Sequence, residues 1–225
     1  MARIDPAVEE VPVERVLDAA LELFSSQGYG ATSMRQIAER SGVSTGNIYH
    51  HFGGKERIFS TLLDRYFAAL LDPDLELNRV FREAEFPEEM ERLAAAIEEV
   101  VDRYGREILL IYVDVIEFGG RHVRPFYEGM RGRFEEIYAA RLEARRERGE
   151  LGDVDPMVAV MVAVRWFFYF FVVERYFGAP MHFGMEPHQA VHEFIHLLRC
   201  GLLPRPEGGC PERPGGVTPG RRKES

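Results

Sequence analysis

Cysteine is scarce in this sequence: only Cys200 and Cys210 occur among its 225 residues. They flank a Gly/Pro-rich stretch and can pair at most once, which excludes a disulfide framework and favours a reducing cytosol. The first ten residues carry acid and proline where a signal peptide needs an unbroken apolar stretch. We therefore expect a globular, cytoplasmic protein.

Motifs of enzyme chemistry are also missing from the sequence. It contains no phosphate-cradling glycine loop, no Gly-x-Ser-x-Gly elbow, no Cys/His pairing near a capped helix and no metal quartet. No period-two pattern is long enough to predict a strand. The sequence therefore predicts an all-α protein that is not an enzyme and needs no cofactor.

Basic residues are fewer than acidic ones, and the formal net charge of −9 argues at first against a nucleic-acid partner. The balance of charges differs, however, in one part of the sequence. Between Gly28 and Arg57 four basic residues stand against two acidic ones, which gives a net charge of +2 before the histidines are counted. This stretch therefore remains a candidate for binding phosphates.

Long apolar runs are limited to one segment, Met157–Val173, which is apolar apart from Arg165. Its 17 residues lie at the lower limit for crossing a membrane. A central arginine opposes insertion by about 2.5–3.5 kcal/mol. We predict a buried helix here and no membrane partner.

Helical periodicity begins near the N-terminus. Apolar residues from Val16 to Phe24 share one face, and Gly28 ends this first predicted helix. Ser33 opens a capping box with Gln36, and the second helix runs to about Arg40. Gly42 supplies a turn, and Ser44 can cap a third helix that ends near His51.

The remainder of the chain is predicted to be helical up to Pro204. A fourth helix from Lys55 closes at Asp72-Pro73, and a loose or short helical connection leads to Pro87. Beyond Pro204, Pro and Gly are frequent and the basic cluster 221–223 lies near the end, which is typical of a disordered tail. The other predicted helices, several opening on a first-turn proline, are 87–104, 106–118, 123–147, 156–177 and 187–203.

Residues 32–59 read TSMRQIAERSGVSTGNIYHHFGGKERIF. This stretch resembles the signature of the TetR family of repressors, in particular the run Gly-Val-Ser-x-Gly-x-Ile-Tyr-x-His-Phe-x-x-Lys, and the resemblance covers about Val13 to Tyr66. It implies a three-helix helix-turn-helix DNA-binding domain (1–54). A fourth helix would join it to a helical ligand-binding and dimerisation domain (55–203), followed by the tail (204–225). The implied function is a ligand-responsive repressor that binds a palindromic operator as a homodimer.

Exposed positions of this stretch are the candidates for DNA contact. Arg35 can reach a guanine edge or a phosphate or lie in solvent, and Asn47 can read adenine or continue the cap. Lys55 joins a positive charge to a helix N-terminus, which makes it a phosphate candidate. Family positions resembling phosphate clamps fall on Tyr49 and His51. The full set is Ser33, Arg35, Thr45, Gly46, Asn47, Tyr49, His50, His51 and Lys55, whereas Ile37, Ala38, Val43, Ile48 and Phe52 are expected to form only the small core.

The last two long helices are expected, by the same resemblance, to pair with those of a second subunit. His188, His192 and His196 recur every four residues on the last helix. They can share a metal ion or form a polar rim of the dimer interface, and because no carboxylate or cysteine is clearly placed to complete a site, we favour the rim.

Aromatic residues crowd the helix at 156–177. Arg165 and Tyr169 share a stripe and can supply the polar contacts of a mostly apolar pocket for an acyl or aromatic effector. Alternatively, Arg165 pairs with Asp114 or Glu117 and the aromatic residues are core. The candidate ligand-binding residues are Tyr112, Tyr127, Met130, Phe134, Arg165, Trp166, Tyr169 and Phe170.

Two other functions remain open on these residues. A helical interaction protein that uses the helix-turn-helix only as a scaffold would show no salt-dependent affinity for duplex DNA. A non-specific binder would show no preference for an operator over random DNA.

Overall fold

The computed structural model describes residues 12–202, and within this range the chain forms nine helices and no strand. The predicted all-α class is therefore confirmed. The predicted tail, with Cys210 and the basic cluster 221–223, lies outside the described residues. The described chain divides into two compact units: unit 1 holds residues 12–79 and 100–131, and unit 2 holds residues 80–99 and 132–202.

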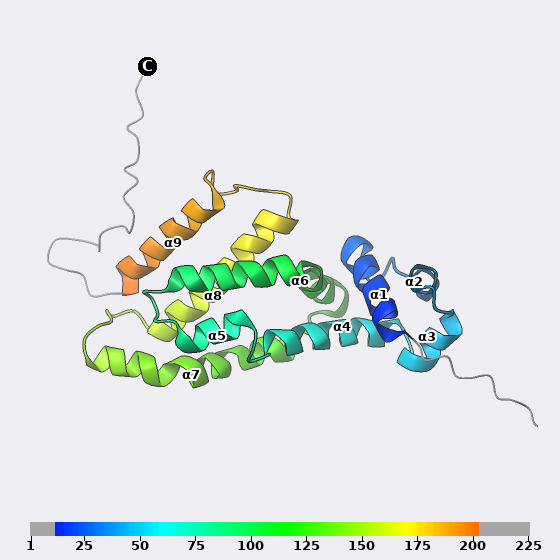
Figure 1. Cartoon of the computed structure of the whole chain (residues 1–225), viewed down its shortest axis with the longest axis horizontal. Helices are drawn as coiled ribbons and strands as arrows, with labels where there is room; N and C mark the ends of the chain where they lie inside the picture. Colours follow the sequence, from blue (N-terminus) through cyan, green and yellow to red (C-terminus); the bar gives the residue numbers. More distant parts are fainter. Residues whose placement is uncertain (1–11, 203–225) are drawn as a thin grey trace, which may run out of the picture. The chain divides into compact units, whose positions relative to one another are not determined.

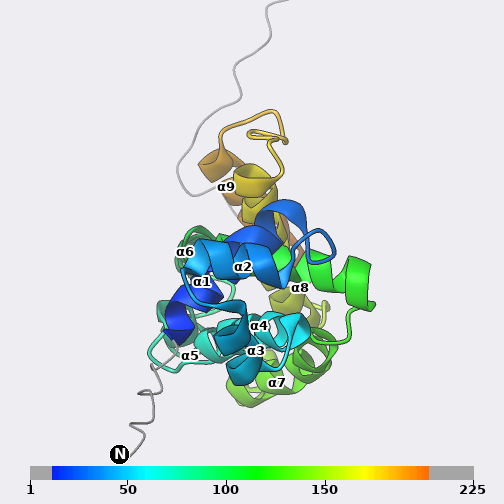
Figure 2. The same ribbon diagram turned by 90° about the vertical axis from the view of Figure 1, so that its right-hand side faces the viewer.

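Unit 1 is built on four N-terminal helices: α1 (Val13–Gln27), α2 (Met34–Ser41), α3 (Thr45–Phe52) and α4 (Lys55–Leu70). Helix α1 packs on α2 and α4, and α3 packs on both α2 and α4 (Figure 1, and Figure 2 for the view turned by 90°). Phe24, Ile37, Ile48 and Phe59 have no exposed surface. Each such side chain contributes about 1.5–3 kcal/mol by burial, so a small apolar core holds these short helices together.

Three further helices contribute residues to both units: α5 (Glu76–Glu83), α6 (Met90–Phe118) and α7 (Arg124–Glu147). In unit 1, Phe67 of α4 stacks on Phe126 of α7 with ring centroids 4.3 Å apart. The short helix α5 confirms the predicted connection between Pro73 and Pro87.

The predicted boundary between helices at 87–104 and 106–118 lies at a kink in α6, where the backbone of Tyr104 leaves helical geometry (φ −115°, ψ 23°). The predicted start at Pro87 is wrong. Helix α6 begins at Met90, so Pro87 is not in its first turn. The chain first turns back on itself, since the Glu89 amide donates to the Glu85 carbonyl at 2.8 Å and the Glu89 carboxylate accepts from the Glu85 amide at 2.9 Å.

Unit 2 contains α8 (Pro156–Tyr176) and α9 (Pro187–Leu202), which pack on each other. The Asp155 carboxylate caps α8 by accepting from the Met157 amide at 2.9 Å. Trp166 lies parallel to Phe170 and to Phe194 of α9, with ring centroids 4.8 and 3.9 Å away. Aromatic stacking thus joins the two helices.

Helix α8 is long and apolar enough to cross a membrane, and no other helix in residues 12–202 passes that test. In the folded chain, however, 61% of its most apolar window is buried. This burial is typical of the core helix of a globular protein, and it supports the prediction of a buried helix at 157–173.

Candidate nucleic-acid interface

Two capped helices joined by a left-handed glycine form the centre of the candidate interface. The Ser33 hydroxyl accepts from the Gln36 amide at 3.2 Å while the Gln36 side chain accepts from the Ser33 amide at 2.7 Å, which confirms the predicted capping box. Gly42 has φ 67° at the end of α2. The Ser44 hydroxyl then accepts from the Asn47 amide at 3.2 Å and caps α3. Short-range hydrogen bonds therefore fix the turn that holds α3.

Arg15 of α1 braces this turn, a role that sequence reasoning missed. Its guanidinium donates from Nε to the Ser41 carbonyl at 2.9 Å and also from Nη2. A Cβ added at Gly42 would lie 2.5 Å from Arg15 Nη2. Arg15 thus satisfies an end carbonyl of α2, and no pattern in the sequence signals a contact over 26 positions.

Helix α3 presents one polar face to solvent. Ile48 and Phe52 are buried, as expected for core positions, and Ala38 and Val43 are buried with them. The side chain of Thr45 is half-buried. A Cβ at Gly46 would meet nothing within 4 Å, so the fold itself does not require glycine there. The exposed residues of α3 are Gly46, Asn47, Tyr49, His50 and His51.

Arg35 and Lys55, the two cationic candidates, lie in different surroundings. Arg35 is exposed and pairs with Glu39 at 2.8 Å, one turn along α2. Such an exposed pair contributes little to stability, so the guanidinium can exchange Glu39 for a phosphate. Lys55 is half-buried, and its Nζ donates to the carbonyls of Tyr29 at 2.7 Å and Thr32 at 2.6 Å.

The ammonium of Lys55 also lies over the Tyr29 ring, 4.0 Å from its centroid. Burial lowers the pKa of Lys55, and the nearby Glu117 carboxylate opposes this shift. The structure therefore uses two of the three donors of Lys55 inside the fold, whereas the sequence suggested a side chain directed at phosphate.

Among the ligand-binding candidates, the unit 2 aromatics are packed against their neighbours. Phe134 is buried edge-on to Phe81 at 5.4 Å, and Phe170 is buried beside the half-buried Trp166. Arg165 and Tyr169 lie on the exposed side of α8, where Tyr169 keeps 58% of its surface.

The remaining candidates belong to unit 1. Tyr112 and Tyr127 are exposed and Met130 is half-buried. The suggested acidic partners of Arg165 are engaged within this unit: Asp114 accepts from the His122 ring at 2.6 Å, and Glu117 accepts from the Tyr29 amide at 2.9 Å. Both acids therefore have hydrogen-bond partners within unit 1.

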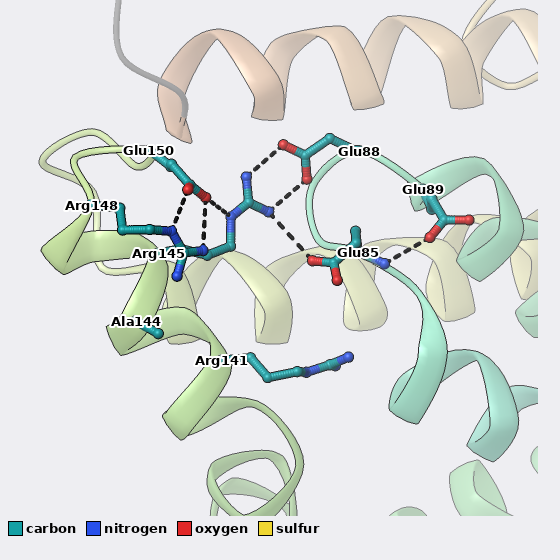
Figure 3. Close-up of a pocket in the computed structure, with 8 residues that line it drawn as sticks. All are labelled: Glu85, Glu88, Glu89, Arg141, Ala144, Arg145, Arg148 and Glu150. Atoms are coloured by element: carbon teal, nitrogen blue, oxygen red, sulfur yellow. Dashed lines mark hydrogen bonds and ion pairs between the residues drawn. The ribbon is translucent and has the colours of Figure 1, made fainter.

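A pocket of about 650 Å³ lies in unit 2, lined by charged rather than apolar residues. Figure 3 shows the Arg145 guanidinium between Glu88 and Glu150. It donates to both Glu88 carboxylate oxygens at 2.7 Å and to Glu150 at 3.0 Å. Hydrogen bonds from Arg145 lower the pKa of Glu88. This network ties α7 to the connection before α6.

The three regularly spaced histidines of α9 do not form a recognisable metal centre. His188 and His192 are exposed and His196 is half-buried. In residues 12–202 no three His, Cys, Asp or Glu side chains are grouped so that they could hold a metal ion.

Comparison with protein families places the helix-turn-helix in a known group. The model of "Bacterial regulatory proteins, tetR family" matches residues 16–62. The chain is 30% identical to the HTH-type transcriptional repressor Rv3405c of Mycobacterium tuberculosis over 61% of its own length and 68% of the relative. It is 40% identical to the HTH-type transcriptional regulator SrpR of Pseudomonas putida, over 35% of its own length and only 38% of that relative.

Solved structures share the fold over most of the chain. The TetR-family regulator PfmR from Thermus thermophilus has a TM-score of 0.59 at 24% identity and is matched over 83% of this chain and 98% of PfmR. AibR, crystallised in complex with isovaleryl coenzyme A and operator DNA, has a TM-score of 0.56 at 17% identity, over 82% and 96% of the two chains.

Proposed function

Because the chain belongs to the TetR family of transcriptional regulators, we propose that it is a cytoplasmic repressor that binds a palindromic operator as a homodimer and is released by a small, largely apolar effector. The observation that carries this proposal is the exposed polar face of α3. The side-chain caps of α2 and α3 and the hydrogen bond from Arg15 to the Ser41 carbonyl hold this face in place. A recognition helix presented in this way suits the major groove.

Roles on the interface follow from the chemistry of each side chain. Asn47, exposed in the first turn of α3, is proposed to read a base edge, and Gly46 lets the backbone approach the DNA. Tyr49 and His51 are proposed to donate to phosphates, with Ser33, Arg35, Thr45 and His50 at the margins. Lys55 is proposed to support DNA binding indirectly, by holding the start of α4 against the turn before α2.

Dimerisation is proposed to use the exposed face of α8. Val158, Val162, Tyr169 and Tyr176 are 36–58% exposed and recur at helical spacing on one side of this helix. A stripe of exposed apolar side chains indicates an interaction surface. Arg165 and Tyr169 are therefore assigned to this face rather than to an effector pocket.

The effector is proposed to be an acyl or aromatic compound. The fold shared with AibR, a protein solved with an acyl coenzyme A and its operator, supports this class of ligand. Tyr112, Tyr127 and Met130 of unit 1 remain the proposed contacts. The effector must bind the operator-free state more tightly, and we propose that it acts by moving α4 and thereby α3.

The proposal is tested by binding of the purified protein to the DNA upstream of its own gene, with random duplex as competitor. Tyr49→Phe should weaken binding to both DNAs alike because it removes a phosphate contact, and Asn47→Ala should weaken operator binding selectively. Gln189→Ala, which shortens an exposed amide in the first turn of α9, is the matched control.

Failure to prefer any genomic duplex over random DNA would contradict the repressor function. Absence of salt-dependent affinity for any duplex would favour the interaction-protein alternative.

A further inference from the structure

The end of α6 contacts the turn between α1 and α2. Glu117, in the last turn of α6, accepts a hydrogen bond from the Tyr29 amide with its Oε1 at 2.9 Å. The two residues are 88 positions apart in the sequence. This contact therefore connects the end of a long helix to the segment that leads into the helix-turn-helix.

Two glycines leave space for this carboxylate. A Cβ added at Gly28 would lie 3.2 Å from Glu117 Oε1, and one added at Gly30 would lie 3.0 Å from Oε2. Gly28 also has φ 85°, which by itself favours glycine. Gly30 has no such backbone requirement, and a Cβ there would crowd the Glu117 carboxylate, which would have to shift by a few tenths of an ångström.

Tyr29 is held at three points. Its amide donates to Glu117, its carbonyl accepts from Lys55 Nζ at 2.7 Å, and its ring lies 4.7 Å from that of Phe118. The same lysine also donates to the carbonyl of Thr32, the residue before the α2 cap. The position of the turn at residues 28–32 thus depends on α6 and sets where α2 begins.

We propose that Glu117 is a positioning residue for operator binding: by holding the Tyr29 amide between Gly28 and Gly30, it fixes the entry to the helix-turn-helix. The inference rests on the proposed function, since it concerns the DNA affinity of the helix-turn-helix. It makes no claim of direct contact between Glu117 and DNA.

A double-mutant cycle tests this role. Glu117→Ala removes the acceptor, and Gly30→Ala crowds the carboxylate without altering Glu117 itself. Each change is expected to lower operator affinity about tenfold, whereas the double variant should bind within about twofold of Glu117→Ala, because residues in contact are not additive. Glu117→Gln keeps an acceptor oxygen and should restore most of the affinity. Gly132→Ala, in a helix with nothing near its Cβ, is the control.

Thermal unfolding and amide hydrogen exchange accompany each binding measurement. If the hydrogen bond from the Tyr29 amide to Glu117 has this role, the Tyr29 amide should exchange faster in Glu117→Ala than in Glu117→Gln, while the unfolding temperatures of the two variants stay close. Should Glu117→Ala not fold, Gly30→Ala and Glu117→Gln are compared with the parent chain by the same two readouts.

Unchanged operator affinity in Glu117→Ala, or independent effects in the double variant, would overturn the positioning role and leave the repressor function standing. A parent chain with no operator preference would overturn the proposed function and this role with it, whatever the exchange of Tyr29 shows.

Discussion

Gly46→Ala is expected to have opposite effects on the stability of the fold and on operator affinity. Gly46 lies in the first turn of α3, and a Cβ there meets nothing within 4 Å. Glycine in a helix is less stable than alanine by about 0.5–1 kcal/mol. We expect the substitution to raise the free energy of unfolding by about 0.5 kcal/mol, which corresponds to a Tm increase of about 1–2 °C in a chain of this size.

Operator binding should change in the opposite direction. A methyl group inserted into a close contact costs about 1–3 kcal/mol, so operator affinity is expected to fall about tenfold. Thermal unfolding by circular dichroism and fluorescence anisotropy with labelled duplex at fixed salt measure the two effects. Gly132→Ala in α7, also with an open Cβ, should raise Tm and leave DNA affinity unchanged. If Gly46→Ala binds operator as tightly as the parent chain, the backbone of α3 does not approach the DNA as proposed.

Three further changes test other parts of the molecule. Tyr169→Glu puts a charge on the exposed face of α8 and should weaken dimerisation about 30-fold or more in sedimentation experiments, as loss of an interface hot spot does, whereas Glu136→Gln on α7 should not; a stable dimer would refute the α8 assignment. Lys55→Met removes two hydrogen bonds from a charged donor and should cost about 2 kcal/mol of stability while the salt dependence of operator binding stays unchanged; a slope lower by about one would indicate a direct phosphate contact. The pKa of Glu88 is lowered in the folded chain, so its pairing with Arg145 stabilises the fold above the unfolded-state pKa, and this stabilisation is lost as pH falls through the folded pKa. Arg145→Met should therefore lower Tm at pH 7 and make Tm decline less steeply in acid. An equal decline of Tm in the parent chain and the variant would contradict this.

The sequence predicted those features that depend on neighbours within a few residues. The capping box of Ser33, the left-handed Gly42 and the cap at Ser44 are all local, and each was found as expected. Pro87 shows the limit of such signals, because proline is accepted at a helix start and also in the turn before it. The hydrogen bonds between Glu85 and Glu89 place it in the turn.

Side-chain partners far along the chain could not be predicted. Lys55 finds its acceptors 23 and 26 positions away, and Arg145 finds Glu88 at 57 positions. The basic residues of α7 resemble an ordinary solvated face in sequence. Only packing between helices shows that Arg145 is largely buried, with 12% of its side chain exposed.

The faces of α8 illustrate why the DNA-reading part is more predictable than the rest. In a helix with polar residues on one side, such as α1, the sequence pattern indicates which side is buried. Helix α8 is apolar nearly all round, so its sequence is equally compatible with Arg165 and Tyr169 lining a pocket or lying on the surface. The structure resolves this ambiguity: Phe194 of α9 stacks on Trp166, whereas Tyr169, about 60° further around α8, remains exposed. This exposed apolar side is the reason we propose α8 as the subunit interface, where the second layer of burial would come from another chain.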